Sequence, residues 1–213
     1  MTPSPYSMKF LPGLLAATLL LGSPLHAEAP SGKGIVHEDF SKPDATATWR
    51  WGAGKWTVAD GVLKGTETAE RKHPAGIACQ RDYHDAVIGF RFRFDGGSTA
   101  MLLLRNRFGN LCRLTLTPSG ARLTKDKPNL PKDTPEKTVE LDTAKLKLAP
   151  GEWHTVRATV RGGHFHAVID GRTTLEGKHP GIDVAKTEIE FLAGGASILF
   201  DDLVAHHLDA KQP

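Results

Sequence analysis

Apolar and polar residues alternate one by one in short runs through most of the chain. Successive side chains of a β-strand point to opposite faces, so this alternation is typical of strands that bury one face. Helical periodicity, by contrast, is nearly absent. We therefore predict an all-β fold with strands within residues 86–94, 100–106, 111–117, 153–160, 164–169 and 197–205.

Glycine-containing pairs separate these runs. Asp60-Gly61, Gly162-Gly163 and Asp170-Gly171 are of the kind that two-residue hairpin turns need, because the central residues of such turns take positive φ. Many short strands joined in this way predict an antiparallel sandwich or barrel. Residues 125–136 contain three prolines among charged residues, and we expect a long exposed loop there.

Three histidines lie close together in residues 151–171, GEWHTVRATVRGGHFHAVIDG. A turn at Gly162-Gly163 would pair Arg161 with His164 and place a strand on either side. His154 would then lie on the face opposite His164 and His166, so we predict that the three form no common site. One face of this hairpin would be entirely apolar, with Val156, Ala158, Val160, Phe165, Ala167 and Ile169.

The first 27 residues have the three parts of a secretory signal peptide. Lys9 is followed by an apolar run, residues 14–21, and by a small residue, Ala27, at the expected cleavage point. The run is too short to span the roughly 30 Å core of a bilayer. We expect cleavage near Ala27, with translation starting at Met1 or at Met8. The mature chain, residues 28–213, would form a single domain that is periplasmic or extracellular.

The charge of the chain is nearly balanced. The formal charge is +3 over 213 residues and falls to +2 without the leader, whose only charged side chain is Lys9. Proteins that bind nucleic acids or membrane surfaces need concentrated basic patches, so we expect neither partner. No second apolar run is long enough for a membrane span. The sequence leaves the oligomeric state open.

Two cysteines, Cys79 and Cys112, each alternate with apolar residues, and neither belongs to a CxxC pair. In an exported protein a disulfide between them would persist. Two buried free thiols are the alternative, and the sequence leaves both open because bridging depends on geometry.

Several segments together resemble a known bacterial family. They are KWTVADGVLKGTE (55–67), AVIGFRFRFDG (86–96), PGEWHTVRATVRGGHFHAVIDG (150–171) and ILFDDLVAHH (198–207). The chain is similar to exported bacterial proteins grouped with 3-keto-disaccharide hydrolases, within the concanavalin A-like lectin/glucanase superfamily. The resemblance spans nearly the whole mature chain. It implies a two-sheet antiparallel jelly-roll sandwich whose concave face meets carbohydrate.

The chain departs from these relatives in residues that carry chemistry. Arg105 matches the arginine of their N-S-G-I-x-L-R strand, but NLCRLTLT (110–117) lacks the acidic and amide residues of the strand that follows. Glucanases of the superfamily place their carboxylates on one strand as E-x-D-x-x-E, and VELD (139–142) has a different spacing. We therefore expect carbohydrate binding. Hydrolysis of ordinary or 3-keto-glycosides, and a non-catalytic envelope or adhesion role, are the alternatives.

Arginines alternate with core-type residues in three successive strands. If the phenylalanines of residues 86–94 face the core, Arg91 faces outward, and Arg105 and Arg113 do so in the next two strands. We expect these arginines to share one face, with Asn106 at its margin. Guanidinium groups there would bind sugar hydroxyls or carboxylated glycans. An ordinary solvated polar face is the alternative.

His73, in ERKHPAG, lies where the relatives also tend to have a histidine. It is the acid/base candidate of the hydrolase hypothesis, because imidazole exchanges a proton near neutral pH; an incidental loop histidine is the alternative. His164 and His166 would need a third ligand to hold a metal, so we predict neither metal nor cofactor. Trp51 is a candidate for sugar stacking, although we expect it to pack against the edge of the fold.

Overall fold

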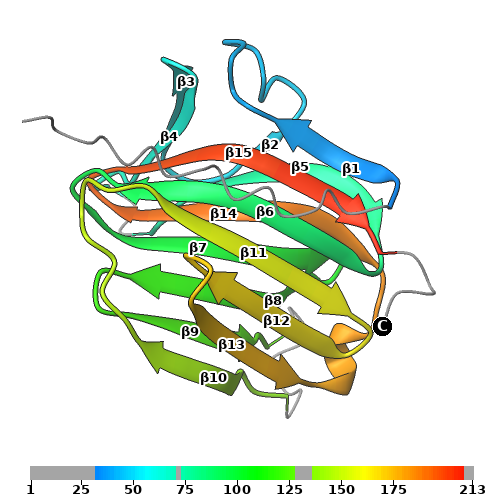
Figure 1. Cartoon of the computed structure of the whole chain (residues 1–213). Helices are drawn as coiled ribbons and strands as arrows, with labels where there is room; N and C mark the ends of the chain where they lie inside the picture. Colours follow the sequence, from blue (N-terminus) through cyan, green and yellow to red (C-terminus); the bar gives the residue numbers. More distant parts are fainter. Residues whose placement is uncertain (1–31, 71–72, 128–135, 209–213) are drawn as a thin grey trace, which may run out of the picture.

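The computed structural model of the protein describes residues 32–70, 73–127 and 136–208. The predicted leader, residues 1–27, lies outside these ranges. The described residues form two antiparallel sheets packed face to face (Figure 1). This is the predicted all-β, two-sheet jelly-roll sandwich. No helix in the described part of the chain is long and apolar enough to cross a membrane.

Sheet A contains eight strands in the order β13-β12-β11-β6-β15-β4-β3, with β1 also paired to β15. Its strands are β1 (Gly34–Glu38), β3 (Lys55–Ala59), β4 (Val62–Thr66), β6 (Ala86–Phe94), β11 (His154–Arg161), β12 (His164–Ile169), β13 (Thr173–Lys178) and β15 (Ile198–His207).

Sheet B contains seven strands in the order β10-β9-β8-β7-β14-β5-β2. Its strands are β2 (Arg50–Trp51), β5 (Ala75–Tyr83), β7 (Gly97–Asn106), β8 (Gly109–Thr117), β9 (Gly120–Lys125), β10 (Val139–Lys145) and β14 (Lys186–Gly195). A single turn of 3₁₀-helix, Pro180–Ile182, precedes β14.

The chain crosses repeatedly between the two sheets, as Figure 1 shows. Strand β5 belongs to sheet B, β6 to sheet A and β7 again to sheet B. Strands β7 to β10 then run as a meander in sheet B, and β11 to β13 as one in sheet A. Consecutive strands such as β6 and β7 therefore turn their polar faces to opposite sides of the sandwich.

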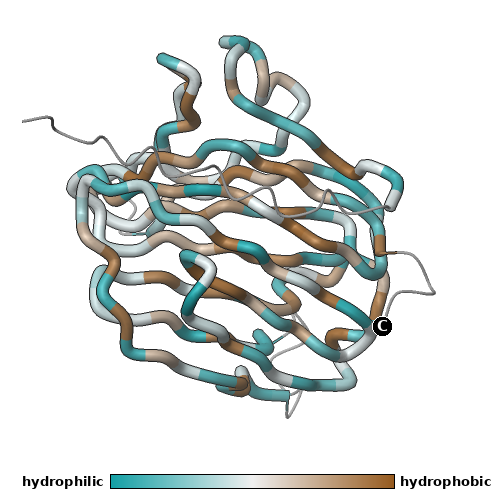
Figure 2. The backbone as a smooth tube through the Cα atoms, viewed as in Figure 1, coloured by the Kyte–Doolittle hydropathy of each residue, from teal (hydrophilic) through white to brown (hydrophobic). Residues whose placement is uncertain are grey.

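The inner faces of both sheets supply one hydrophobic core. Phe90 of β6, Phe191 of β14 and Phe200 of β15 meet within it, with the ring centroids of Phe191 and Phe200 4.4 Å apart and those of Phe90 and Phe191 5.0 Å apart. The alternation of hydropathy along the strands is visible in Figure 2. Burial of one such side chain contributes about 2 kcal/mol, so the alternation fixes which face of each strand turns inward.

The hairpin of β11 and β12 has the predicted register. Arg161 pairs with His164 and Val156 with Ile169 across the turn, where Gly162 has a φ of 53°. Its predicted apolar face is buried in the core. His154 is buried as well, whereas His164 and His166 are half-buried on the opposite face, so the prediction that the three histidines form no common site is confirmed.

His154 joins the start of β11 to the end of β12. Its Nδ1 lies 2.8 Å from Oδ2 of Asp170, and its Nε2 lies 3.1 Å from the carbonyl oxygen of Ala149. Oδ1 of Asp170 also accepts a hydrogen bond from the backbone N–H of Thr155 at 2.7 Å. These contacts satisfy the polar atoms of a histidine that is only 5% exposed, so His154 has a structural role.

The two cysteines are buried free thiols, which resolves the alternatives left open by the sequence. Cys79 of β5 faces Ile189 of β14, Ile189 faces Leu104 of β7, and Leu104 faces Cys112 of β8. Three strand spacings, about 14 Å, therefore separate the cysteines. A disulfide requires Cα atoms within about 7 Å, so the fold excludes this bridge.

Lys186, at the start of β14, is fully buried. Its Nζ donates to the carbonyl oxygens of His84, Ile182 and Val184 at 2.8, 3.0 and 2.8 Å. Burial lowers the pKa of this lysine below its ordinary value. The three carbonyl groups replace water around the ammonium group and tie the turn between β5 and β6 to the segment before β14.

Candidate functional site

Two arginines and two glutamates form a cluster on the outer face of sheet B. Glu188 and Glu190 are two residues apart on β14, so both side chains point to the same face. Arg105 of β7 lies directly opposite Glu188. Arg50, on the edge strand β2, faces Ala78 of β5, which in turn faces Glu190. We call these four residues the arginine–glutamate cluster.

Each guanidinium group of the cluster contacts both carboxylates. Arg105 donates from Nη1 to Glu190 Oε2 at 2.6 Å, and its Nε lies 3.1 Å from Glu188 Oε2. Arg50 donates from Nε and Nη2 to the two oxygens of Glu188 at 3.0 and 2.7 Å, and its Nη2 lies 3.5 Å from Glu190 Oε1. All four carboxylate oxygens are thus in ionic contact. The hydrogen bond to Glu188 raises the pKa of Arg50 above its ordinary value.

The carboxylates of the cluster are more deeply buried than its guanidinium groups. The side chains of Glu190 and Glu188 are 5% and 13% exposed, whereas those of Arg105 and Arg50 are 23% and 36% exposed. Gly76 makes room for this arrangement, since a Cβ atom there would lie 3.2 Å from Glu190 Oε1. The more deeply placed carboxylates therefore hold the guanidinium groups in place at the surface.

A second ion pair lies beside the cluster on the same face. Arg113 of β8 donates from Nε and Nη2 to Asp126 Oδ2 at 3.0 and 2.6 Å, and the hydroxyl of Thr124 donates to Asp126 Oδ1 at 3.0 Å. Leu103 of β7 lies between the two groups, because it pairs with Arg113 on one side and with Glu190 on the other. Two strand spacings, about 10 Å, thus separate Glu190 from Arg113.

The face is hollowed next to Arg113. A cavity of about 330 Å³ is lined by Arg113, Arg122, Thr124, Asp126, Thr138 and Glu140. Adjacent to it, a cavity of about 230 Å³ is lined by Thr115, Thr117, Gly120, Ala121 and Arg122. Hydroxyl, guanidinium and carboxylate groups therefore surround a shallow depression over β8 to β10.

The structure separates the arginines that the alternation placed on one face. Arg105 and Arg113 share the outer face of sheet B, but Arg91 lies on β6 in sheet A, on the opposite side of the sandwich. The expectation of a single shared face is therefore wrong. Alternation distinguishes the inner from the outer face of a strand, but it does not tell which sheet the strand joins.

The remaining predicted site residues lie outside the cluster. Asn106 ends β7, and its Oδ1 accepts a hydrogen bond from the backbone N–H of Phe108 at 2.9 Å, which stabilises the turn to β8. His73 is exposed before β5, with its Nδ1 2.8 Å from the carbonyl oxygen of Pro74. Its role as an acid/base stays a prediction.

Several residues of this face were missed by the sequence analysis. Glu188 and Glu190 belong to the alternating run EIEF (188–191), whose period of two could have identified a strand with two carboxylates on one side. Asp126 lies in the segment expected to be an exposed loop, yet Lys125 ends strand β9 and both residues are buried. Lys125 and Asp126 therefore depart from the predicted exposed loop, of which residues 128–135 lie outside the described ranges.

Two aromatic side chains at the margins of sheet B are exposed. Trp51 pairs with the core residue Ile77, so it points away from the face that carries Arg50. Trp51, next to Arg50, is 55% exposed, so the expectation of edge packing is wrong for most of its surface. Phe108, at the tip of the β7–β8 turn, is 50% exposed. The guanidinium carbon of Arg107 lies 4.6 Å from the centre of its ring. Such side chains can stack on the apolar faces of sugar rings.

No group of three or more histidine, cysteine or acidic side chains in the described ranges is arranged to hold a metal ion. Nε2 of His164 instead lies 3.4 Å from Oε2 of Glu176 on the neighbouring strand β13. The cluster can bind ligands through fixed N–H donors. Its carboxylates are held by arginines, so they are poorly placed to remove a proton from a ligand.

Residues 44–204 match the family of 3-keto-α-glucoside-1,2-lyase-like domains. The chain belongs to this family. The match covers all of the arginine–glutamate cluster and the Arg113–Asp126 pair. A comparison with curated proteins finds no match.

Solved structures with the same fold include proteins that act on or bind carbohydrate. The carbohydrate-binding module CBM66 of Bacillus subtilis is 10% identical, with a TM-score of 0.60 over 74% of this chain and 94% of its own. Porphyranase B of Zobellia galactanivorans is 9% identical, with a TM-score of 0.63 over 81% and 91%. A Bacillus subtilis protein of unknown function with a galectin-like fold is 12% identical, with a TM-score of 0.63 over 83% and 96%. At these low sequence identities, the similarity shows that the proteins share a fold and shows nothing further.

Proposed function

We propose that this member of the 3-keto-α-glucoside-1,2-lyase-like family is an exported carbohydrate-binding protein that holds a glycan on the outer face of sheet B. The observation that carries the proposal is the pair of neighbouring arginines, Arg105 and Arg113. Each is fixed by a buried carboxylate, and Arg113 lines the cavity of about 330 Å³. Fixed donors lose little conformational entropy when they bind a ligand, which favours affinity.

The chemistry of this face suits a polyhydroxylated ligand. Sugar hydroxyl groups both donate and accept hydrogen bonds. Arg105 and Arg113 would donate to hydroxyl oxygens, and Glu140 and the threonines of the cavity would accept or donate at its rim. Phe108 would add apolar contact with ring C–H groups at the border of the face.

A glycan array followed by isothermal titration calorimetry tests this proposal. We expect a glycan that binds the native protein to lose about tenfold or more in affinity with Arg105→Gln or Arg113→Gln, because each variant loses a charge-assisted hydrogen bond. Arg157→Gln is the matched control, since Arg157 is an exposed arginine on β11 in sheet A. Absence of binding across the array, or equal affinity of all three variants, would overturn the proposal.

An enzymatic function is the second candidate, and the juxtaposition of Glu188, Glu190 and Arg105 favours it. In a 1,2-elimination a base removes the proton at C2 of a 3-keto-glucoside, next to the ketone. The electron pair forms the C1–C2 double bond, and the glycosidic oxygen leaves and takes up a proton as an alcohol. A carboxylate would serve as the base, and a guanidinium would stabilise the enolate oxygen.

The engagement of all four carboxylate oxygens with arginines leads us to prefer binding over catalysis. Incubation with a 3-keto-α-glucoside and chromatography of the products distinguishes the two. Turnover that is abolished by Glu190→Gln would establish the lyase function. Turnover that survives Glu190→Gln but is abolished by His73→Ala would instead support His73 as the acid/base.

Export through the predicted leader is part of the proposal. Its test is expression of the full chain in a bacterium, followed by cell fractionation and N-terminal sequencing. We expect the protein outside the cytoplasm with an N-terminus close to Glu28. An uncleaved protein in the cytoplasm would contradict export and would leave the binding proposal to its own test.

A further inference from the structure

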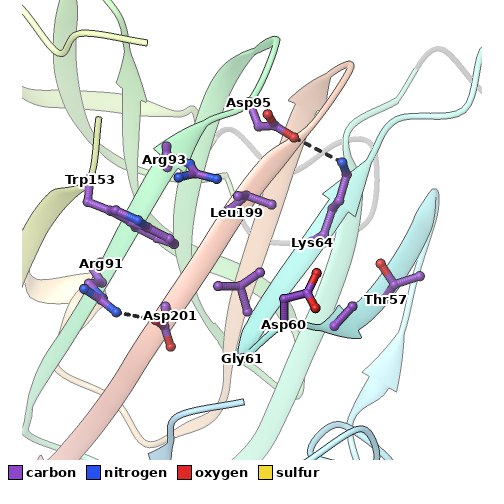
Figure 3. A pocket seen from close by; sticks show the side chains of 12 residues that line it. Thr57, Asp60, Gly61, Lys64, Arg91, Arg93, Asp95, Trp153, Leu199 and Asp201 are labelled. Atoms are coloured by element: carbon purple, nitrogen blue, oxygen red, sulfur yellow. Dashed lines mark hydrogen bonds and ion pairs between the residues drawn. The ribbon is translucent and has the colours of Figure 1, made fainter. Parts of the chain in front are cut away.

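A second and larger hollow lies on the outer face of sheet A (Figure 3). Its volume is about 600 Å³, within the range of pockets that hold small ligands. It lies on the other side of the sandwich from the arginine–glutamate cluster, because the two groups belong to different sheets.

Four strands supply the floor of this hollow. Thr57 of β3 pairs with Lys64 of β4, Lys64 pairs with Leu199 of β15, and Leu199 pairs with Arg93 of β6. These residues therefore form one row across the sheet, about 14 Å from end to end at the usual strand spacing. The β3–β4 turn, Asp60-Gly61, borders one side of the hollow in Figure 3.

Trp153 borders the opposite side and positions two arginines. The guanidinium carbons of Arg91 and Arg93 lie 4.9 and 5.1 Å from the centre of its ring. Figure 3 shows the indole between the two guanidinium groups. Stacking of this kind holds a guanidinium group in place while its N–H donors, which lie in the plane of the group, stay available.

The two arginines differ in what they bind. Arg91 donates to Asp201 Oδ2 at 2.6 Å, and its Nε lies 2.8 Å from Asp202 Oδ2. Arg93, by contrast, makes no ion pair within 4 Å among the residues that the structure describes. The hollow therefore contains a stacked guanidinium group whose donors have no carboxylate partner there.

Carboxylates also line the hollow, on more than one of its sides (Figure 3). Asp60 makes no ion pair with a described residue, and Asp95 is paired with Lys64 at 3.1 Å, with both side chains about half exposed. The charged residues that line the hollow are three cations, Lys64, Arg91 and Arg93, and three anions, Asp60, Asp95 and Asp201. The lining carries no net formal charge and so gives no net attraction to a charged ligand, whereas its donors and acceptors suit a neutral ligand with many polar groups.

We propose that this hollow binds a neutral saccharide unit, at a site separate from the glycan face of sheet B. Arg93 and Lys64 donate to sugar hydroxyl oxygens, and Asp60 and Asp95 accept hydrogen bonds from sugar hydroxyl groups. Leu199 and Val62 contact the C–H groups of the ring. Trp153 is a positioning residue, which acts by holding Arg93. The proposal does not depend on the function of the sheet B face.

The test is an NMR titration of the purified protein with ¹⁵N-labelled tryptophan, in which Trp153→Phe assigns the Trp153 indole signal. The probes are the neutral disaccharides maltose, cellobiose, trehalose and sucrose, with glucuronate and glucosamine as charged competitors. We expect a saturable shift of the Trp153 signal with at least one neutral disaccharide. Arg93→Gln and Asp60→Asn should each weaken it about tenfold, since each removes a charge-assisted hydrogen bond.

Two control variants separate this site from the sheet B face. Arg157→Gln should leave the titration unchanged, and so should Arg105→Gln, whose effect is confined to the other sheet. The absence of a saturable Trp153 shift with all four disaccharides overturns the proposal, as does a shift that persists unchanged in both Arg93→Gln and Asp60→Asn. Tighter binding of glucuronate or glucosamine than of every neutral sugar overturns the assignment of a neutral ligand.

Discussion

Arg105 Nη1 lies 2.6 Å from Oε2 of Glu190, whose side chain is 5% exposed. Removal of the carboxylate leaves Arg105 without its buried partner. We expect Glu190→Ala to lower the free energy of unfolding by about 2 kcal/mol, the usual cost of losing a hydrogen bond to a charged group. Urea denaturation measures this change. Glu176→Ala, at a glutamate whose side chain is 64% exposed, should change the stability little. A Glu190→Ala protein as stable as the native one would show that Glu190 does not stabilise the cluster.

Gly76 lies against the cluster, and its substitution should disturb the site without disrupting the fold. A Cβ atom at this position would lie 2.9 Å from Leu192 Cδ2 and 3.2 Å from Glu190 Oε1. We expect Gly76→Ala to displace the Glu190 carboxylate and to weaken glycan binding severalfold in calorimetry. Gly34→Ala is the control, because a Cβ atom there meets nothing within 4 Å. Equal binding by the two variants would argue against a role for the cluster geometry.

Both thiols should be inert in the folded protein. Burial raises the pKa of Cys79 and of Cys112, and the thiolate is the reactive form. We expect no reaction with Ellman's reagent under native conditions and reaction of two thiols after unfolding in guanidinium chloride. A mass spectrum of the unfolded, unreduced protein that shows a linked Cys79–Cys112 peptide after digestion would contradict the strand order of sheet B.

Lys186 should contribute strongly to stability through its three carbonyl partners. We expect Lys186→Met to lower the free energy of unfolding by about 3 kcal/mol, because methionine fills the space but leaves three carbonyl groups, in buried and part-buried contacts, without their donor. Thermal denaturation measures the effect. Lys147→Met, at an exposed lysine, should alter the midpoint little. A Lys186→Met protein as stable as the native one would mean that water reaches these carbonyl groups.

Local sequence patterns predicted the strands and the hairpin of β11 and β12, because these features depend on residues close together in the sequence. The Gly162-Gly163 turn fixes the register, and the apolar faces fix the inner sides. The sheet to which each strand belongs depends on crossings between distant segments, so Arg91 was expected beside Arg105 and is not. The hollow beside Trp153 likewise depends on rows formed by β3, β4, β15 and β6, which no single stretch of sequence contains.

The pairing of β1 with β15 has a consequence for how the protein is made. Gly34 lies opposite His206, so one of the first described strands completes its hydrogen bonds only with the last. A chain synthesised from its N-terminus cannot complete sheet A until β15 is available, and contacts so distant in sequence form slowly. Strand β1 therefore stays without its hydrogen-bonding partner until β15 has been synthesised.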